Sequence, residues 1–232
     1  MPSQTYILYI ETATEVCSVC LSANGKLVSL REQLSGMVHS EKLAVFIDEL
    51  FKEAGITASE LSAIALSSGP GSYTGLRIST AMAKGMCYPF SIPLISVNTL
   101  ACMATFYLEL NPSLVANTLI CPMLDARRND VYTAVCDSMG YFITEILCID
   151  LSNNSFPNLL QSNPIIFIGN GAEKASKFID HPNATFIPTF KCSSKGMVKL
   201  SEQKFLKSEF ENLAYFEPGY LKEAFVTKPK GA

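Results

Sequence analysis

Apolar and polar positions alternate in three stretches near the start of the chain, over residues 5–11, 16–22 and 26–32. This period of two predicts three strands whose side chains point to opposite faces in turn. Asn24-Gly25 stands between the last two stretches and is typical of a tight hairpin turn. We therefore expect the fold to open with three antiparallel strands.

A helix is predicted over residues 41–54, where apolar positions recur at spacings of four, three and four. Ser40 is its expected N-cap, and Gly55 follows its last turn. The stripe that would cover the sheet consists of Leu43, Ile47, Leu50 and Ala54. Phe46 and Phe51 lie beyond the centre of this stripe, so either the core extends around the helix or the helix also contacts a partner.

Residues 64–97 predict a strand, a glycine-rich loop, a helix and a second strand. The loop lies where a helix N-terminus presents free N–H groups to an anion or to another chain, although a simple tight turn is the alternative. It is not a P-loop, because no lysine follows its last glycine, and Thr74 replaces the third glycine of a dinucleotide-binding loop. The helix, over residues 76–88, carries soft side chains such as Met82 and Met86, which permit close approach of another helix.

The second half repeats this order of elements. After a helix over residues 99–110, the periodicity predicts strands over 118–125, 130–137, 141–149, 165–168 and 184–187, and helices over 156–161, 173–180 and 197–211. A duplicated β-β-β-α-β-α-β plan is that of the actin-like ATPases, an α/β fold of two ribonuclease-H-like halves, each a mixed sheet with helices on its faces. We expect domains over residues 1–103 and 104–232, with a C-terminal tail that packs back on the first.

In actin-like proteins the first hairpin turn binds phosphate, and carboxylates at strand ends hold Mg²⁺ through water. Corresponding points in this sequence are occupied by Glu11, Thr12, Thr14 and Asp125. Residues 168–172 resemble an adenosine-binding turn. A cleft between the halves is therefore the expected position of any site.

Composition bounds the class of protein. The chain has 232 residues, of which 48% are hydrophobic and 17% charged, as in an ordinary globular protein with a large core. Its net charge of −3 argues against a broad nucleic-acid-binding surface. No apolar run is long enough to span a membrane and none resembles a signal peptide, so we expect a cytoplasmic protein that does not bind membranes.

Eight cysteines with no disulfide-type spacing favour a reducing compartment. Cys17 and Cys20 have the spacing of a redox or zinc pair, but in a strand they point to opposite faces, so we expect core packing. The two histidines, His39 and His181, are expected at the surface. We therefore predict no metal site in this chain.

Four motifs in this order resemble the bacterial TsaB (YeaZ) family, in the glycoprotease-like branch of the actin-like superfamily. They are Ile10-Glu-Thr-Ala-Thr-Glu-Val-Cys-Ser-Val, Gly69-Pro-Gly-Ser-Tyr-Thr-Gly-Leu-Arg77, Leu124-Asp-Ala-Arg-Arg-Asn-Asp-Val-Tyr132 and Glu217-Pro-Gly-Tyr-Leu-Lys222. The resemblance covers nearly the whole chain, and the glycine-rich motif is its most specific part. It departs from the family at Glu11, where aspartate is usual, which weakens any inference that this chain binds Mg-nucleotide alone.

The resemblance implies a non-catalytic subunit in the synthesis of N6-threonylcarbamoyladenosine in tRNA. The partners that it implies are a TsaD-type transferase, bound through the N-terminal helices, and a TsaE-type ATPase. It further implies a homodimer when the partner is absent and contact with tRNA only through the complex. No cofactor is expected on this chain, because ATP and a metal ion belong to the partner subunits.

Other functions remain as alternatives. An actin-like ATPase or small-molecule kinase would use Glu11 and Asp125 in its own cleft, although the second half carries no phosphate motif. A metalloprotease would need more histidines than the chain has. A serine hydrolase is equally disfavoured, because Pro70 stands where Gly-x-Ser-x-Gly around Ser72 requires its first glycine.

The candidate residues form two groups, and none is assigned a catalytic role. Those expected to shape the cleft are Glu11, Thr12, Thr14, Gly69, Gly71, Ser72, Thr74, Gly75, Arg77, Asp125, Arg127 and Tyr132. Those expected to form the partner surface are Leu43, Phe46, Ile47, Leu50, Phe51, Met82 and Met86.

Overall fold

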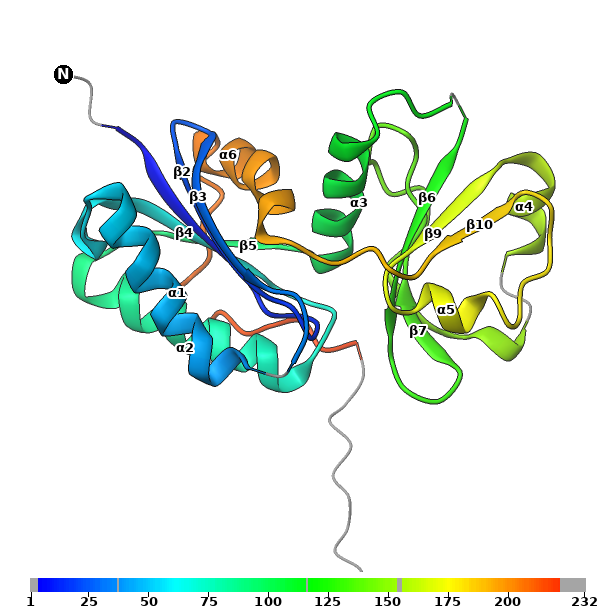
Figure 1. Cartoon of the computed structure of the whole chain (residues 1–232), viewed down its shortest axis with the longest axis horizontal. Coiled ribbons are helices and arrows are strands. Elements are labelled where there is room, and N and C mark those ends of the chain that lie inside the picture. The colour runs from blue at the N-terminus through cyan, green and yellow to red at the C-terminus, as the bar shows by residue number, and fades with distance from the viewer. Residues whose placement is uncertain (1–3, 37, 116, 154–155, 222–232) are drawn as a thin grey trace, which may run out of the picture.

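Two five-stranded mixed sheets stand side by side, each flanked by helices (Figure 1). The computed structural model describes residues 4–36, 38–115, 117–153 and 156–221. No helix within these ranges is both long and apolar enough to cross a membrane. The two-lobed α/β architecture predicted from the repeated pattern is confirmed.

The first sheet has the strand order β3-β2-β1-β4-β5. Its strands are β1 (Tyr6–Glu11), β2 (Cys17–Ala23), β3 (Lys26–Gln33), β4 (Leu61–Ser67) and β5 (Leu94–Val97). The first three are antiparallel, as predicted, while β4 and β5 run parallel to β1. Asn24 and Gly25 both have positive φ, which matches the tight turn expected between β2 and β3.

The second sheet repeats this topology in the order β10-β9-β6-β7-β8. Its strands are β6 (Leu119–Asp125), β7 (Asp130–Thr133), β8 (Leu147–Asp150), β9 (Ile165–Ile168) and β10 (Ala184–Ile187). The predicted strands over residues 130–137 and 141–149 were too long. β7 and β8 pair with each other, but in the segment of chain that joins them, residues 134–146, only isolated bridges form, in which Cys136 pairs with Ile120 and with Phe142.

The helices follow the predicted positions with several corrected ends. They are α1 (His39–Ala54), α2 (Tyr73–Phe90), α3 (Thr99–Leu110), α4 (Pro157–Ser162), α5 (Ala172–Ala175) and α6 (Val198–Leu206), with short 3₁₀ turns η1 (Ala58–Glu60), η2 (Leu151–Asn153) and η3 (Ser194–Met197). Ser40 is not the N-cap of α1, because the helix begins at His39 and Val38 precedes it without a side-chain cap. Gly55 does end it in the left-handed conformation.

The remaining corrections concern three helices. α2 begins three residues earlier than predicted because the Ser72 hydroxyl accepts a hydrogen bond from the Gly75 N–H and caps it. The helices predicted over residues 173–180 and 197–211 stop at Ala175 and Leu206.

Both faces of the first sheet are buried, against different layers. Leu8 and Ile10 of β1 face the core under α1 and α2, whereas Ile7 and Tyr9 face a core that includes α3 and strand β6. The latter core therefore joins the lobes. Cys17 lies in the first core and Cys20 in the second, which confirms their predicted packing on opposite faces.

The C-terminal third returns to the first lobe. η3 contacts β1 and α6 contacts β5, and Glu211 forms a bridge to Leu94. The predicted boundary between residues 103 and 104 lies inside α3, so we propose that the division is better placed after β5, with residues 194–221 assigned to the first lobe.

Residues 217–221 of the last motif belong to the described part of the chain, and its Lys222 lies outside it. The Gly219 N–H donates to the Ser68 carbonyl, and the Tyr220 ring lies 4.9 Å from that of Tyr73.

The backbone at the start of α2 lies directly against the turn that follows β1. A Cβ atom at Gly75 would lie 2.0 Å from the Thr12 carbonyl oxygen, and the Thr12 hydroxyl donates to the Gly75 carbonyl at 2.8 Å. Only glycine leaves room for this contact. Further along the same helix, a Cβ atom at Gly85 would meet nothing within 4 Å.

We expect Gly75→Ala to lower the free energy of unfolding by about 1–3 kcal/mol, because the methyl group forces the two backbones apart. Gly85→Ala is the matched control and should raise the free energy of unfolding by about 0.5–1 kcal/mol, because alanine has the higher helix propensity. Urea unfolding followed by circular dichroism measures both. Equal behaviour of the two variants would contradict the close contact.

Candidate functional site: the cleft between the lobes

A cavity of about 630 Å³ opens between the two lobes. The first lobe contributes the turn after β1 and the loop before α2, and the second contributes the equivalent turn after β6. Its lining is Ala13, Thr14, Glu15, Pro70, Gly71, Ser72, Tyr73, Thr74, Leu124, Asp125, Ala126, Arg127, Arg128, Asp130, Tyr132, Asn170, Gly219, Tyr220 and Leu221. Seven of the predicted cleft residues are in this set, namely Thr14, Gly71, Ser72, Thr74, Asp125, Arg127 and Tyr132.

The wall from the first lobe is built by backbone hydrogen bonds. The Ser72 N–H donates to the Ala13 carbonyl at 2.7 Å, which ties the glycine-rich loop to the turn after β1. The Gly69 carbonyl accepts from the Thr99 N–H and from the Asn98 side chain, which ties the loop to α3. Predicted cleft residues Gly69, Gly75 and Thr12 therefore support the wall from behind and do not line the cavity.

The wall from the second lobe centres on Asp125. Its carboxylate accepts from the Arg127 N–H at 2.6 Å and from the Lys174 ammonium group at 2.8 Å. Its own N–H donates to the Asn170 side chain at 2.9 Å. The predicted turn at residues 168–172 thus borders the cleft, where it positions the end of β6.

Arg77 lies at the edge of the cleft, outside its lining. Its guanidinium group donates to the Tyr73 hydroxyl at 2.7 Å and lies 5.2 Å from the centre of that ring. Tyr73 in turn contacts Tyr220, whose pKa is raised by burial. These three side chains hold the C-terminal segment across the mouth of the cavity.

Glu11 was predicted to face the cleft, and this prediction is wrong. Its side chain is fully buried, and its Oε1 accepts from the Ala13 N–H at 2.6 Å and from the Ser67 hydroxyl at 3.1 Å. Burial raises the pKa of this carboxyl group. Because β1 alternates, Glu11 points to the same side as Ile7 and Tyr9, toward α3.

His39 was predicted at the surface and is instead buried. Its Nε2 lies 2.9 Å from the Thr14 carbonyl and donates to it, so the start of α1 supports the turn after β1. His181, which is partly buried, accepts a hydrogen bond from the Asn183 N–H. Neither histidine lines the cavity.

The predicted partner surface also needs correction. Leu43, Ile47 and Leu50 are buried in the core between α1 and the sheet, so they cannot contact a partner directly. Their predicted stripe against the sheet is confirmed. The other four, Phe46, Phe51, Met82 and Met86, are only partly buried.

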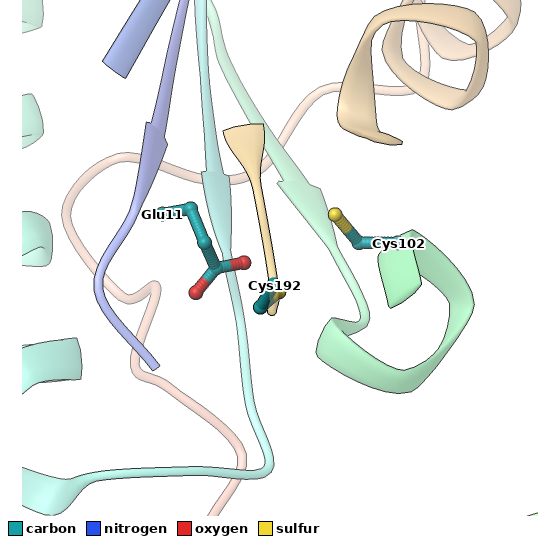
Figure 2. A group of neighbouring side chains, drawn as sticks. All are labelled: Glu11, Cys102 and Cys192. Carbon is teal, nitrogen blue, oxygen red and sulfur yellow. The ribbon is translucent and has the colours of Figure 1, made fainter. Parts of the chain in front are cut away.

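The charges in the cleft are mixed, since Glu15, Asp125 and Asp130 lie with Arg127 and Arg128. Of the two strand-end carboxylates, Glu11 is buried away from the cavity, whereas Asp125 lines it and pairs with Lys174 at 2.8 Å. In the described part of the chain, three possible metal ligands do cluster elsewhere: Glu11, Cys102 and Cys192 (Figure 2). Sequence spacing missed this group because its members come from three distant segments.

Two lobes of one topology, facing each other across a cleft, define an actin-like α/β protein. A family model described as TsaD, tRNA N6-adenosine threonylcarbamoyltransferase, matches residues 33–224. The tRNA threonylcarbamoyladenosine biosynthesis protein TsaB of Haemophilus influenzae is 27% identical over 234 residues, with 96% of this chain and 95% of the relative covered. That of Escherichia coli is 34% identical over 128 residues, with 55% and 53% covered.

A solved structure from Pseudomonas aeruginosa, described as an uncharacterized protein with similarity to peptidase YeaZ, superposes with a TM-score of 0.81. It is 22% identical, and the alignment covers 94% of this chain and all of that one, which supports the fold. The chain belongs to the TsaB/YeaZ family, within the wider family that the TsaD model describes. Its curated relatives are named for the biosynthesis of threonylcarbamoyladenosine in tRNA.

The geometry assigns the Ser72 hydroxyl to capping α2, so its removal should affect stability. We expect Ser72→Ala to lower the free energy of unfolding by about 1 kcal/mol, as is usual for loss of an N-cap. Thr74→Ala, exposed in the same turn, is the control and should change it by less than about 0.5 kcal/mol. Denaturant unfolding compares them, and a Ser72→Ala protein as stable as wild type would rule out the capping role.

Proposed function

We propose that this chain is a non-catalytic subunit of the assembly that attaches a threonylcarbamoyl group to N6 of adenosine in tRNA. In this proposal it pairs with a TsaD-type transferase, a TsaE-type ATPase joins the pair, and the complex acts in the cytoplasm. Family membership supports the pathway. The observation that carries the subunit role is the outer face of the first lobe.

This outer face, which we call the α1–α2 face, combines soft and small residues. Phe51 of α1 and Met82 and Met86 of α2 are partly exposed between the helices, and Ala81 and Gly85 are exposed beside them. Flexible methionines adapt to a partner, and small residues let a second helix approach closely. α1 and α2 lie on the side of the first sheet away from the second lobe (Figure 1), so a partner can dock without entering the cleft.

The same face would support a homodimer when the partner is absent, because a helix pair of complementary shape from a second copy of the chain could pack against it. Contact with tRNA would come through the complex, since the chain has a net charge of −3. These assignments rest on the α1–α2 face being a binding surface.

A substitution at Gly85 tests the α1–α2 face without disturbing the core. We expect Gly85→Arg to weaken binding to the TsaD-type protein of the same organism by at least about tenfold, because a long charged side chain would clash and be desolvated at the contact. Gly85→Ala should still bind. Light scattering coupled to size-exclusion chromatography, on each variant alone and mixed, gives the stoichiometry.

Binding of Gly85→Arg at wild-type strength would remove the α1–α2 face from the proposal. Leu206→Arg, an exposed apolar residue of α6 on another surface, controls for the added charge and is expected to bind normally.

The alternative, an ATPase or kinase with its own cleft chemistry, predicts nucleotide binding by the isolated chain. We expect calorimetric titration with Mg-ATP to give no saturable heat, because Glu11 is buried and Lys174 already neutralises Asp125. Saturable binding that Asp125→Asn abolishes would favour the alternative instead.

A further inference from the structure

Glu11, Cys102 and Cys192 meet in the buried layer between the two lobes. Glu11 ends β1, Cys102 lies in α3, and Cys192 lies on the segment between β10 and η3 (Figure 2). All three are at most 2% exposed, and one oxygen and the two sulfur atoms lie within 4.8 Å of one another. We call these residues the Glu–Cys–Cys cluster.

One oxygen of the carboxylate lacks a strong protein partner. Glu11 Oε1 is satisfied by the Ala13 N–H and the Ser67 hydroxyl, whereas Oε2 is buried and forms no hydrogen bond of ordinary geometry with a described residue. The Cys192 thiol is only a weak hydrogen-bonding neighbour of this carboxyl group. Figure 2 shows one carboxylate oxygen directed toward Cys192. A buried polar atom left unpaired is costly, so the position of Oε2 points to a ligand that it would bind.

The chemistry of the three groups suits a thiophilic divalent cation. Zn²⁺ binds cysteine sulfur at about 2.3 Å and carboxylate oxygen at about 2.0–2.2 Å in a tetrahedral arrangement, which sets sulfur atoms roughly 3.8 Å apart. The Cys102 thiol is 3.2 Å from the Ser193 carbonyl, a weak bond that metal binding could replace. Because the three ligand atoms lie within 4.8 Å of one another, a contraction of at most about 1 Å would bring the two sulfur atoms to their separation in a zinc site.

A small crevice beside the cleft borders the cluster at Cys192. It has a volume of about 10 Å³, reaches Cys192, and shares Thr14, Glu15, Leu124 and Asn170 with the main cavity. This is close to the space that one water molecule requires. The crevice therefore brings solvent-sized space to the edge of the cluster at Cys192, while Glu11 and Cys102 are fully buried behind it.

We propose that the Glu–Cys–Cys cluster is a structural zinc site that fastens β1, α3 and the segment after β10 to one another. Zn²⁺ would displace the protons of both thiols and of the Glu11 carboxyl group into solvent, leaving three anionic ligands on one divalent ion. Burial raises the pKa of Glu11, and the neighbouring Cys102 together with burial raises that of Cys192, so the site without metal favours the protonated forms of these two groups. The alternative is a neutral core cluster that binds no ion.

The test uses the full chain, chelator-treated and with all eight cysteines reduced. Co²⁺ is the spectroscopic probe, because thiolate coordination produces an intense near-ultraviolet charge-transfer band. We expect one Co²⁺ per chain, displaced by Zn²⁺, with release of protons into weakly buffered solution. Zn²⁺ should also raise the thermal unfolding midpoint.

Cys102→Ser, Cys192→Ser and Glu11→Gln should each lower the affinity by at least about 100-fold, since losing even an outer-shell partner can cost that much. Glu11→Gln retains the Oε1 acceptor for Ala13 and Ser67, so it should fold. Cys121→Ser, a buried cysteine outside the cluster, is the matched control and should bind normally.

Circular dichroism in chelator establishes that each variant is folded before titration. The proposal is overturned if the reduced wild-type chain binds no stoichiometric metal, which would identify a neutral core cluster. It is also overturned if folded Glu11→Gln and Cys192→Ser bind Co²⁺ as tightly as wild type.

Discussion

The close contact between the turn after β1 and the start of α2 is the constraint on which the arrangement of the first lobe depends. The Ser72 N–H donates to the Ala13 carbonyl, and the Gly75 backbone lies against that of Thr12 with no side chain between them. Backbones this close cannot slide relative to each other, so the first turn of α2 is fixed against the edge of the cleft. The helix axis, and with it the α1–α2 face, follows from that anchoring point.

Much of the fold could be predicted because the spacing of hydrophobic residues along the chain differs between its strands and its helices. Strand β9 and helix α3 have the ends that the pattern gave them, and Gly55 stops α1 as expected. The errors occur where a local rule competed with a contact that the sequence does not reveal. Ser40 resembled an N-cap, yet the helix begins one residue earlier, at His39. The His39 side chain lies against the turn after β1, where it donates a hydrogen bond to the Thr14 carbonyl.

The outline of the candidate site was predicted, and the errors in that prediction share one cause. Position at a strand end placed Glu11 in the cleft, but strand parity already put it on the side of Ile7 and Tyr9. The alternation of side chains along β1 does not reveal which elements cover that side of the sheet. α3 and the segment around Cys192 come from distant parts of the chain, and no spacing rule joins them to β1. The cluster is therefore a property of the tertiary fold.

These features divide the first sheet into two sides with different roles. One side is covered by α1 and α2, whose outer surface is exposed to solvent. The other side is joined to the second lobe through α3 and the buried cluster. α2 belongs to both arrangements, since its first turn forms a wall of the cleft while its later turns carry the α1–α2 face. The same helix therefore links the wall of the cleft to the face on which we propose that a partner docks. In the proposed subunit role, a chain with one strand-end carboxylate buried and the other paired would keep the geometry of an actin-like cleft in order to support its partner.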